Sequence, residues 1–172
     1  MSVTWRAGDG PPTSSLRAFS RESVATTPGL GRPSASDSSS HTTGLVLSAA
    51  KAFFGDPAQW NPETLMLAAL GQCHVLSFLR AAGMRRFDVA WTSVDVSGEL
   101  TLSPDGSGRF TLIEIQPATL IPRLDARAHA EAYRQLHSQA HKWCFIANST
   151  ACKILVHPDS GADNIGAAVS SE

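Results

Sequence analysis

Two cysteines that lie far apart in the sequence are the residues with the clearest potential for chemistry. Cys73 lies within the apolar segment NPETLMLAALGQCHVLSFLRAAG (61–83), and Cys144 lies in the later segment AHKWCFIANS. A buried cysteine can be inert packing, a metal ligand, or a nucleophile that reacts as its thiolate. From spacing alone, packing is the favoured interpretation for both residues, and the third cysteine, Cys152, is interpreted in the same way.

Metal binding and serine hydrolysis find little support in the sequence. Adjacent helical residues point about 100° apart, so Cys73 and His74 cannot readily bind one ion together. His141 and Cys144 are nearer to ligand spacing, but one pair does not complete a tetrahedral site. The sequence contains no G-x-S-x-G nucleophile motif. We therefore expect no metal and no cofactor, and we interpret His74 as a polar helix residue with a hydrogen-bond partner.

The composition predicts an ordinary globular protein. The chain has 172 residues, a formal net charge of -1 and 42% hydrophobic residues, with no basic surplus that would suggest nucleic acid or anionic lipid. No long apolar run lacks polar interruptions, and residues 1–6 contain no apolar signal region. The odd count of 3 cysteines does not suggest a disulfide framework. A cytoplasmic location without a membrane partner is expected.

A long helix over residues 61–83 is the strongest structural signal. Asn61 suits the N-cap, Pro62 the first helical position, and Glu63 places negative charge in the first turn. Gly83 is a credible stop. The helix is apolar nearly all round, so it should be covered on most sides, in part by a partner subunit.

The remaining pattern predicts an α+β domain over residues 1–158 with mostly antiparallel strands. A Pro-, Gly- and Ser-rich segment over 26–43 is expected to be a flexible loop, and residues 159–172 a frayed tail. The expected strands cover residues 1–6, 16–24, 44–50, 87–102, 108–119 and 154–157, and a second helix covers 125–140.

The segment NPETLMLAALGQCH, followed further along the chain by AHKWCFIANS, resembles the OsmC/Ohr family of hydroperoxide-reducing proteins. SSLRAFSRES and FFGDPAQWNPE resemble the N-terminal strand and the approach to the central helix in one branch of that family. The resemblance implies an OsmC-like fold, in which a long central helix packs on antiparallel sheets within an intertwined homodimer.

The resemblance also implies an activity and a set of site residues. The protein would be an antioxidant thiol-dependent peroxidase of the oxidative stress response, reducing organic hydroperoxides, with hydrogen peroxide as a second candidate substrate. Cys73 would be the peroxidatic cysteine and Cys144 the resolving cysteine, and a dithiol reductant would reset the pair. An arginine would hold the thiolate and a glutamate would orient that arginine. Glu63 matches the glutamate.

The arginine is less closely defined. Arg21 is the first choice, and Arg17 and Lys51 are alternatives. Ser23 occupies a position at which many members of this branch carry histidine. These departures leave open a second reading, in which the same fold binds a hydrophobic or thiol ligand with little turnover.

Helix geometry adds a requirement that does not depend on the family. Cys73 lies nearly three turns after the N-cap, where the helix dipole has faded, and burial raises a thiol pKa. A reactive Cys73 is therefore expected to need a nearby cation. Glu63 lies about 15 Å from Cys73 along the helix axis, at about 1.5 Å per residue. It can therefore contribute to the Cys73 site only if two helices meet in a dimer.

Overall fold

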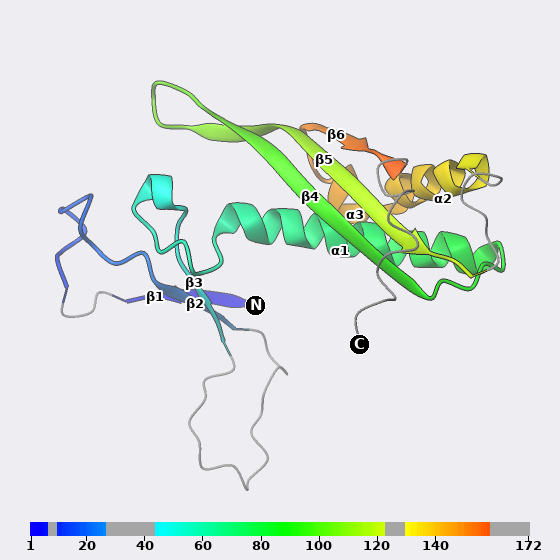
Figure 1. Cartoon of the computed structure of the whole chain (residues 1–172). Coiled ribbons are helices and arrows are strands. Elements are labelled where there is room, and N and C mark those ends of the chain that lie inside the picture. Colours follow the sequence, from blue (N-terminus) through cyan, green and yellow to red (C-terminus); the bar gives the residue numbers. More distant parts are fainter. Residues whose placement is uncertain (7–9, 27–43, 123–129, 159–172) are drawn as a thin grey trace, which may run out of the picture. The chain divides into compact units, whose positions relative to one another are not determined.

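The computed structural model describes residues 1–6, 10–26, 44–122 and 130–158 (Figure 1). The chain divides into two compact units, Met1–Met66 and Leu67–Glu172. Nearly all of the loop expected over 26–43, and the whole tail expected over 159–172, lie outside the described residues. The architecture is α+β, as predicted, with one long helix and two sheets.

The first unit contains a three-stranded antiparallel sheet in the order β1-β2-β3. Its strands are β1 (Ser2–Trp5), β2 (Ser23–Thr26) and β3 (Leu45–Leu47). The short 3-10 helix η1 (Lys51–Phe53) follows β3. The backbone N–H of Ser48 then donates to the carbonyl of Trp60 at 2.7 Å, which fixes the approach to the long helix.

The strand predicted over residues 16–24 is wrong for most of its length. Consecutive turns occupy this segment, and the N–H of Ala18 donates to the carbonyl of Ser15 at 2.8 Å. The guanidinium of Arg21 donates to the carbonyls of Leu16 and Phe19, and these bonds hold the backbone of this segment in turns beside the side chain. Alternating polarity matched the period of a strand, but local hydrogen bonds determine the backbone here.

The long helix α1 (Pro62–Met84) matches its prediction to within a residue or two at each end. Its cap is reciprocal: Asn61 Oδ1 accepts from the N–H of Thr64 at 2.9 Å, and Thr64 Oγ1 accepts from the N–H of Asn61 at 3.1 Å. Gly83 lies inside the helix, and the left-handed residue beyond its end is Arg86, with φ 60°. By length and composition α1 could cross a membrane, but core helices of globular proteins share this composition.

In the second unit, α1 packs on a long hairpin (Figure 1). The hairpin consists of β4 (Trp91–Leu102) and β5 (Gly108–Leu120), and β6 (Lys153–Val156) pairs with β5 in parallel, an exception to the expected antiparallel order. Gly71 allows α1 to approach β4 closely, because a Cβ at this position would lie 3.1 Å from Val96 and 3.2 Å from Val94.

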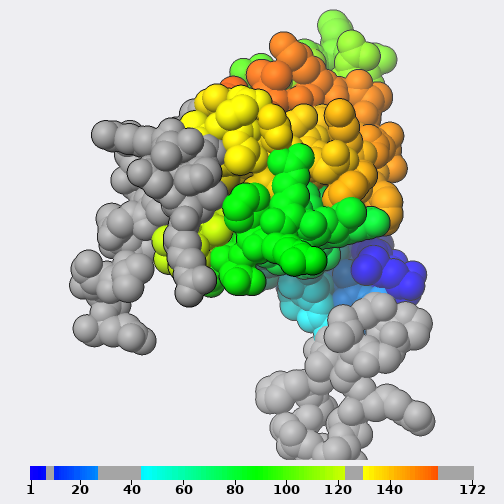
Figure 2. Space-filling view, turned by 90° about the vertical axis from the view of Figure 1, so that its right-hand side faces the viewer, coloured from blue at the N-terminus to red at the C-terminus, as the bar shows by residue number. Residues whose placement is uncertain are grey.

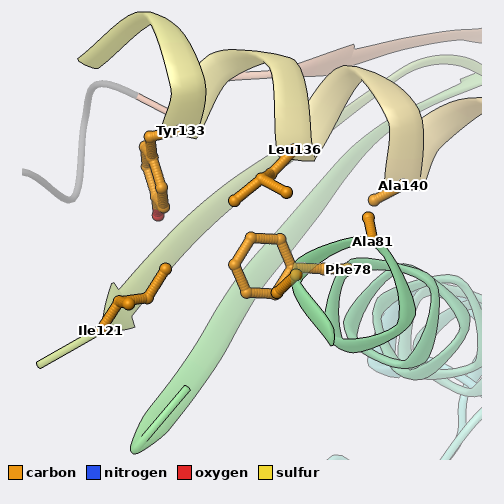
Figure 3. Packing of buried hydrophobic residues seen from close by; sticks show 7 residues of the cluster. Phe78, Ala81, Ile121, Tyr133, Leu136 and Ala140 are labelled. Carbon is orange, nitrogen blue, oxygen red and sulfur yellow. The ribbon is translucent and has the colours of Figure 1, made fainter. Parts of the chain in front are cut away.

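The core of the second unit lies between α1 and the second helix, α2 (Ala130–Trp143). Figure 3 shows Phe78 of α1 beneath Leu136 of α2, and Ala81 facing Ala140, small residues that let the two helices approach. Figure 2 shows the yellow-to-orange surface of α2 adjoining the green end of α1. The predicted start of this helix at residue 125 lies outside the described residues. The four-residue helix α3 (Phe145–Asn148), which follows α2, was not predicted.

Candidate functional site

The two cysteines singled out in the sequence lie together in the second unit. Cys73 is on α1 and is half-buried, whereas Cys144 is fully buried at the N-cap of α3. The two thiols lie close enough for each to shift the pKa of the other, and both are free. Residues that are remote in the sequence therefore form one dithiol pair.

Cys144 is held in place from both sides. The N–H of Ala147 donates to Cys144 Sγ at 3.4 Å, which caps α3, and the thiol lies 4.0 Å from the carbonyl oxygen of Leu70 on α1. The N–H of Cys144 donates to the carbonyl of His141 at 3.2 Å. The junction of α2 and α3 thus places this sulfur against α1, beside Cys73.

The pKa of the Cys73 thiol lies below its usual value of 9.0. Burial acts in the opposite direction, but hydrogen bonds to the thiolate outweigh it. The backbone of Ile146 provides the strongest of these, followed by the Cys144 thiol, the backbone of Phe145 and the Ser77 hydroxyl. Cys73 is therefore the sulfur more prepared to ionise.

The pKa of Cys144 shifts the other way, to about 11. Burial is the main cause, the N–H of Ala147 opposes it, and the neighbouring Cys73 raises the pKa further. The pair is thus asymmetric, with one accessible sulfur that ionises first and one buried sulfur that keeps its proton.

The expectation that Cys73 needs a nearby cation stays a prediction, although hydrogen bonds within one chain already lower the pKa of this thiol. The groups that lower its pKa are hydrogen-bond donors at the start of α3 and on α1. Ser77 could have been found from the sequence, because it follows Cys73 by one helical turn. The α3 donors could not, since a four-residue helix leaves no periodic pattern.

The predicted cationic and acidic residues belong to the first unit. Arg17 and Arg21 do not share a strand face, but their guanidinium groups lie 5.9 and 5.4 Å from the ring centroid of Phe54. Both line one pocket of about 290 Å³ together with Asp56 and Gln59.

Glu63 lies in the first turn of α1, as expected. One of its carboxylate oxygens is buried and has no hydrogen-bond partner in the described part of the chain. Lys51 is exposed in η1. The contact of Glu63, Arg21, Arg17 or Lys51 with the dithiol pair remains a prediction.

A buried histidine pair lies next to the cysteines in the sequence. His74 Nε2 and His137 Nδ1 are 3.0 Å apart and share a hydrogen bond, so the expectation of a partner for His74 is confirmed. Burial, and then the charge of His141, lowers the pKa of His74 to about 4, and burial, and then His74, lowers that of His137 to about 3. Both are neutral at neutral pH.

Comparison with known proteins identifies the class. The family model for OsmC-like protein matches residues 55–157, and the chain therefore belongs to the OsmC-like family. No curated protein was found to match the sequence.

Solved structures share the fold. An OsmC-like protein of unknown function from Vibrio cholerae is 24% identical over 91% of this chain and 95% of its own, with a TM-score of 0.74. An organic hydroperoxide resistance protein from Elizabethkingia anophelis is 16% identical over 91% of this chain and 98% of its own, with a TM-score of 0.59. The organic hydroperoxide resistance protein OsmC from Legionella pneumophila is 21% identical over 66% of this chain and 80% of its own, with a TM-score of 0.52.

Proposed function

We propose that this protein is a thiol-dependent peroxidase that reduces organic hydroperoxides through Cys73 and Cys144. The observation that carries the proposal is the asymmetric dithiol pair. The more accessible sulfur, Cys73, has the lowered pKa, and the buried sulfur, Cys144, has a pKa of about 11. A peroxidatic sulfur must be an accessible thiolate, and a resolving sulfur must lie within bonding reach of it.

The reaction begins when the Cys73 thiolate attacks the distal oxygen of the hydroperoxide. The O–O bond breaks, a sulfenic acid forms on Cys73, and the alkoxide takes a proton and leaves as the alcohol. The sulfur of Cys144 then attacks the Cys73 sulfur, and the sulfenic hydroxyl leaves with the Cys144 proton as water. An external dithiol reduces the resulting disulfide by exchange and restores both thiols.

Apolar side chains near the pair support an organic substrate. Phe145 is 77% exposed, although its backbone faces Cys73, and Leu76, one turn from Cys73, is 57% exposed. Both can contact the hydrocarbon part of a hydroperoxide, which hydrogen peroxide lacks.

A homodimer belongs to the same proposal. Exposed apolar residues on α1 of the second unit, Leu76, Leu79 and Met84, would be covered by a second copy. The partner's first unit would then bring Arg21 and Glu63 to Cys73. One buried oxygen of Glu63 has no hydrogen-bond partner among the described residues, which supports a role for this carboxylate in binding such a guanidinium.

One observation favours the alternative, an OsmC-fold binding protein with little turnover. The Arg21 guanidinium is already occupied by the carbonyls of Leu16 and Phe19 and lies 3.9 Å from the ring centroid of Phe19. An arginine held in this way must be released before it can bind a thiolate or a peroxide.

Turnover of cumene hydroperoxide with dithiothreitol as reductant distinguishes the two functions. The peroxidase proposal predicts catalytic consumption by the wild type and by Cys152→Ser, the matched control, and none by Cys73→Ser. Consumption no faster than that of Cys73→Ser would instead support a binding protein.

A further inference from the structure

The His74–His137 hydrogen bond is a polar contact inside an otherwise apolar helix interface. The His137 ring stacks on Phe78 with centroids 4.3 Å apart, and the Tyr133 ring meets it edge-on at 4.6 Å. Both histidines are buried, with relative exposures of 0% for His74 and 1% for His137. In such surroundings a hydrogen bond is strong, and losing it leaves nitrogen atoms without a partner.

The pair connects α1, which carries Cys73, to α2, which ends directly before Cys144. His74 directly follows Cys73 on α1. His137 lies on α2, seven residues before Cys144, about 10 Å along a helix at about 1.5 Å per residue. The backbone bond from Cys144 to His141 then joins α2 to the start of α3. A slide of α2 along α1 would therefore carry Cys144 with it.

Apolar packing alone does not prevent such a slide. Contacts such as Phe78 with Leu136 are non-directional, and small shifts change their area little (Figure 3). A buried polar pair is directional and tolerates one register, as buried polar residues do in helix pairs elsewhere. The dithiol pair needs this accuracy, because a disulfide forms only within a narrow range of Cα separations.

We propose that His74 and His137 are positioning residues that set the register of α2 and α3 against α1, and thereby hold Cys144 on Cys73. The importance of the histidine pair for catalysis rests on the proposed function. The placement of the two sulfurs itself can be measured without a peroxide.

The test measures alkylation of Cys73 by iodoacetamide against pH in a reduced Cys152→Ser background. His137→Leu removes the hydrogen bond, whereas His137→Asn keeps an amide near the place of Nδ1. Phe78→Leu is the control, because it removes the ring stacked on His137 and weakens the same core but leaves the His74–His137 hydrogen bond in place. We expect alkylation at pH 7 to be about tenfold slower in His137→Leu, the effect of losing about one hydrogen bond to a charged group. The pH profile of Cys73 alkylation should move to higher pH in His137→Leu. In His137→Asn and Phe78→Leu, the rate and the pH profile should stay close to those of the wild type.

Two results would overturn the inference. One is a wild-type alkylation profile in folded His137→Leu. The other is an equal change in His137→Leu and Phe78→Leu, which would mean that general packing, and not the hydrogen bond, places the sulfurs. If His137→Leu does not fold, His137→Gln takes its place. The amide of Gln lies one methylene further out than that of Asn, so His137→Gln should not restore the wild-type alkylation profile. An absence of peroxide turnover with this alkylation pattern intact would refute the proposed function alone.

Discussion

The buried histidine pair predicts that acid destabilises this protein at an unusually mild pH. The folded-state pKa values of His74 and His137, about 4 and about 3, lie below the usual 6.5. As pH falls through 6.5, the unfolded chain binds protons at both positions and the folded chain does not. The contribution of these residues to the free energy of unfolding is therefore complete above pH 6.5, and it is lost progressively as pH falls from there towards about 4 for His74 and about 3 for His137.

The size of the loss follows from the usual histidine pKa. At pH 5.5 protonation stabilises the unfolded chain by about 1.4 kcal/mol for each histidine, relative to neutral pH. Because both folded-state values lie well below 5.5, almost none of this is recovered in the folded protein. The pair thus predicts a loss of about 2.7 kcal/mol between pH 7.5 and pH 5.5, a decrease in Tm of about 5–10 °C in a protein of this size.

Urea denaturation at the two pH values measures this loss. The matched variant is His74→Gln/His137→Asn, whose amides do not titrate and can still bond to each other. The free energy of unfolding should fall by about 2.7 kcal/mol more in the wild type than in this variant. The carboxylates contribute equally to both proteins and cancel. An equal pH dependence in the two would refute the reasoning, because the histidines would then not be buried and neutral.

Three further predictions concern the dithiol pair and the central helix. Cys144→Ser should leave a sulfenic acid on Cys73 that dimedone traps after one equivalent of hydroperoxide, whereas the wild type should give no adduct; an adduct of equal yield in both would argue against Cys144 as the resolving residue. In the reduced Cys152→Ser protein, iodoacetamide at pH 8 should modify Cys73 well before Cys144, as their opposite pKa shifts require, and peptide mass spectrometry would show a reversed order if the assignment is wrong. Asn61→Ala should cost about 1 kcal/mol in urea denaturation through loss of the α1 cap, with Asn61→Asp as the control that keeps it.

The parts of the fold that the sequence predicted are those with local causes. Helix α1 is marked by its capping residue and its apolar length. The β4–β5 hairpin is marked by its turn, in which Asp105 accepts from the N–H of Ser107 and Gly106 has φ 85°. The strand predicted over 16–24 failed, because a period of two also occurs in consecutive turns.

The site was only partly predictable for a related reason. Residue types and spacing left Cys73 and Cys144 as plain packing, and the resemblance to a family supplied their pairing. The donors from α3 and the partner of His74 depend on how α2 and α3 meet α1, a contact between segments more than 60 residues apart. Such contacts leave no periodic mark on one sequence.

Disulfide mapping after one equivalent of cumene hydroperoxide shows whether Cys73 and Cys144 act as a peroxidatic and resolving pair. We expect rapid loss of two thiols per chain and a Cys73–Cys144 linkage in the peptide mass spectrum, with Cys152 still reduced. Oxidation no faster than that of a free thiol, or a disulfide that includes Cys152, would contradict it.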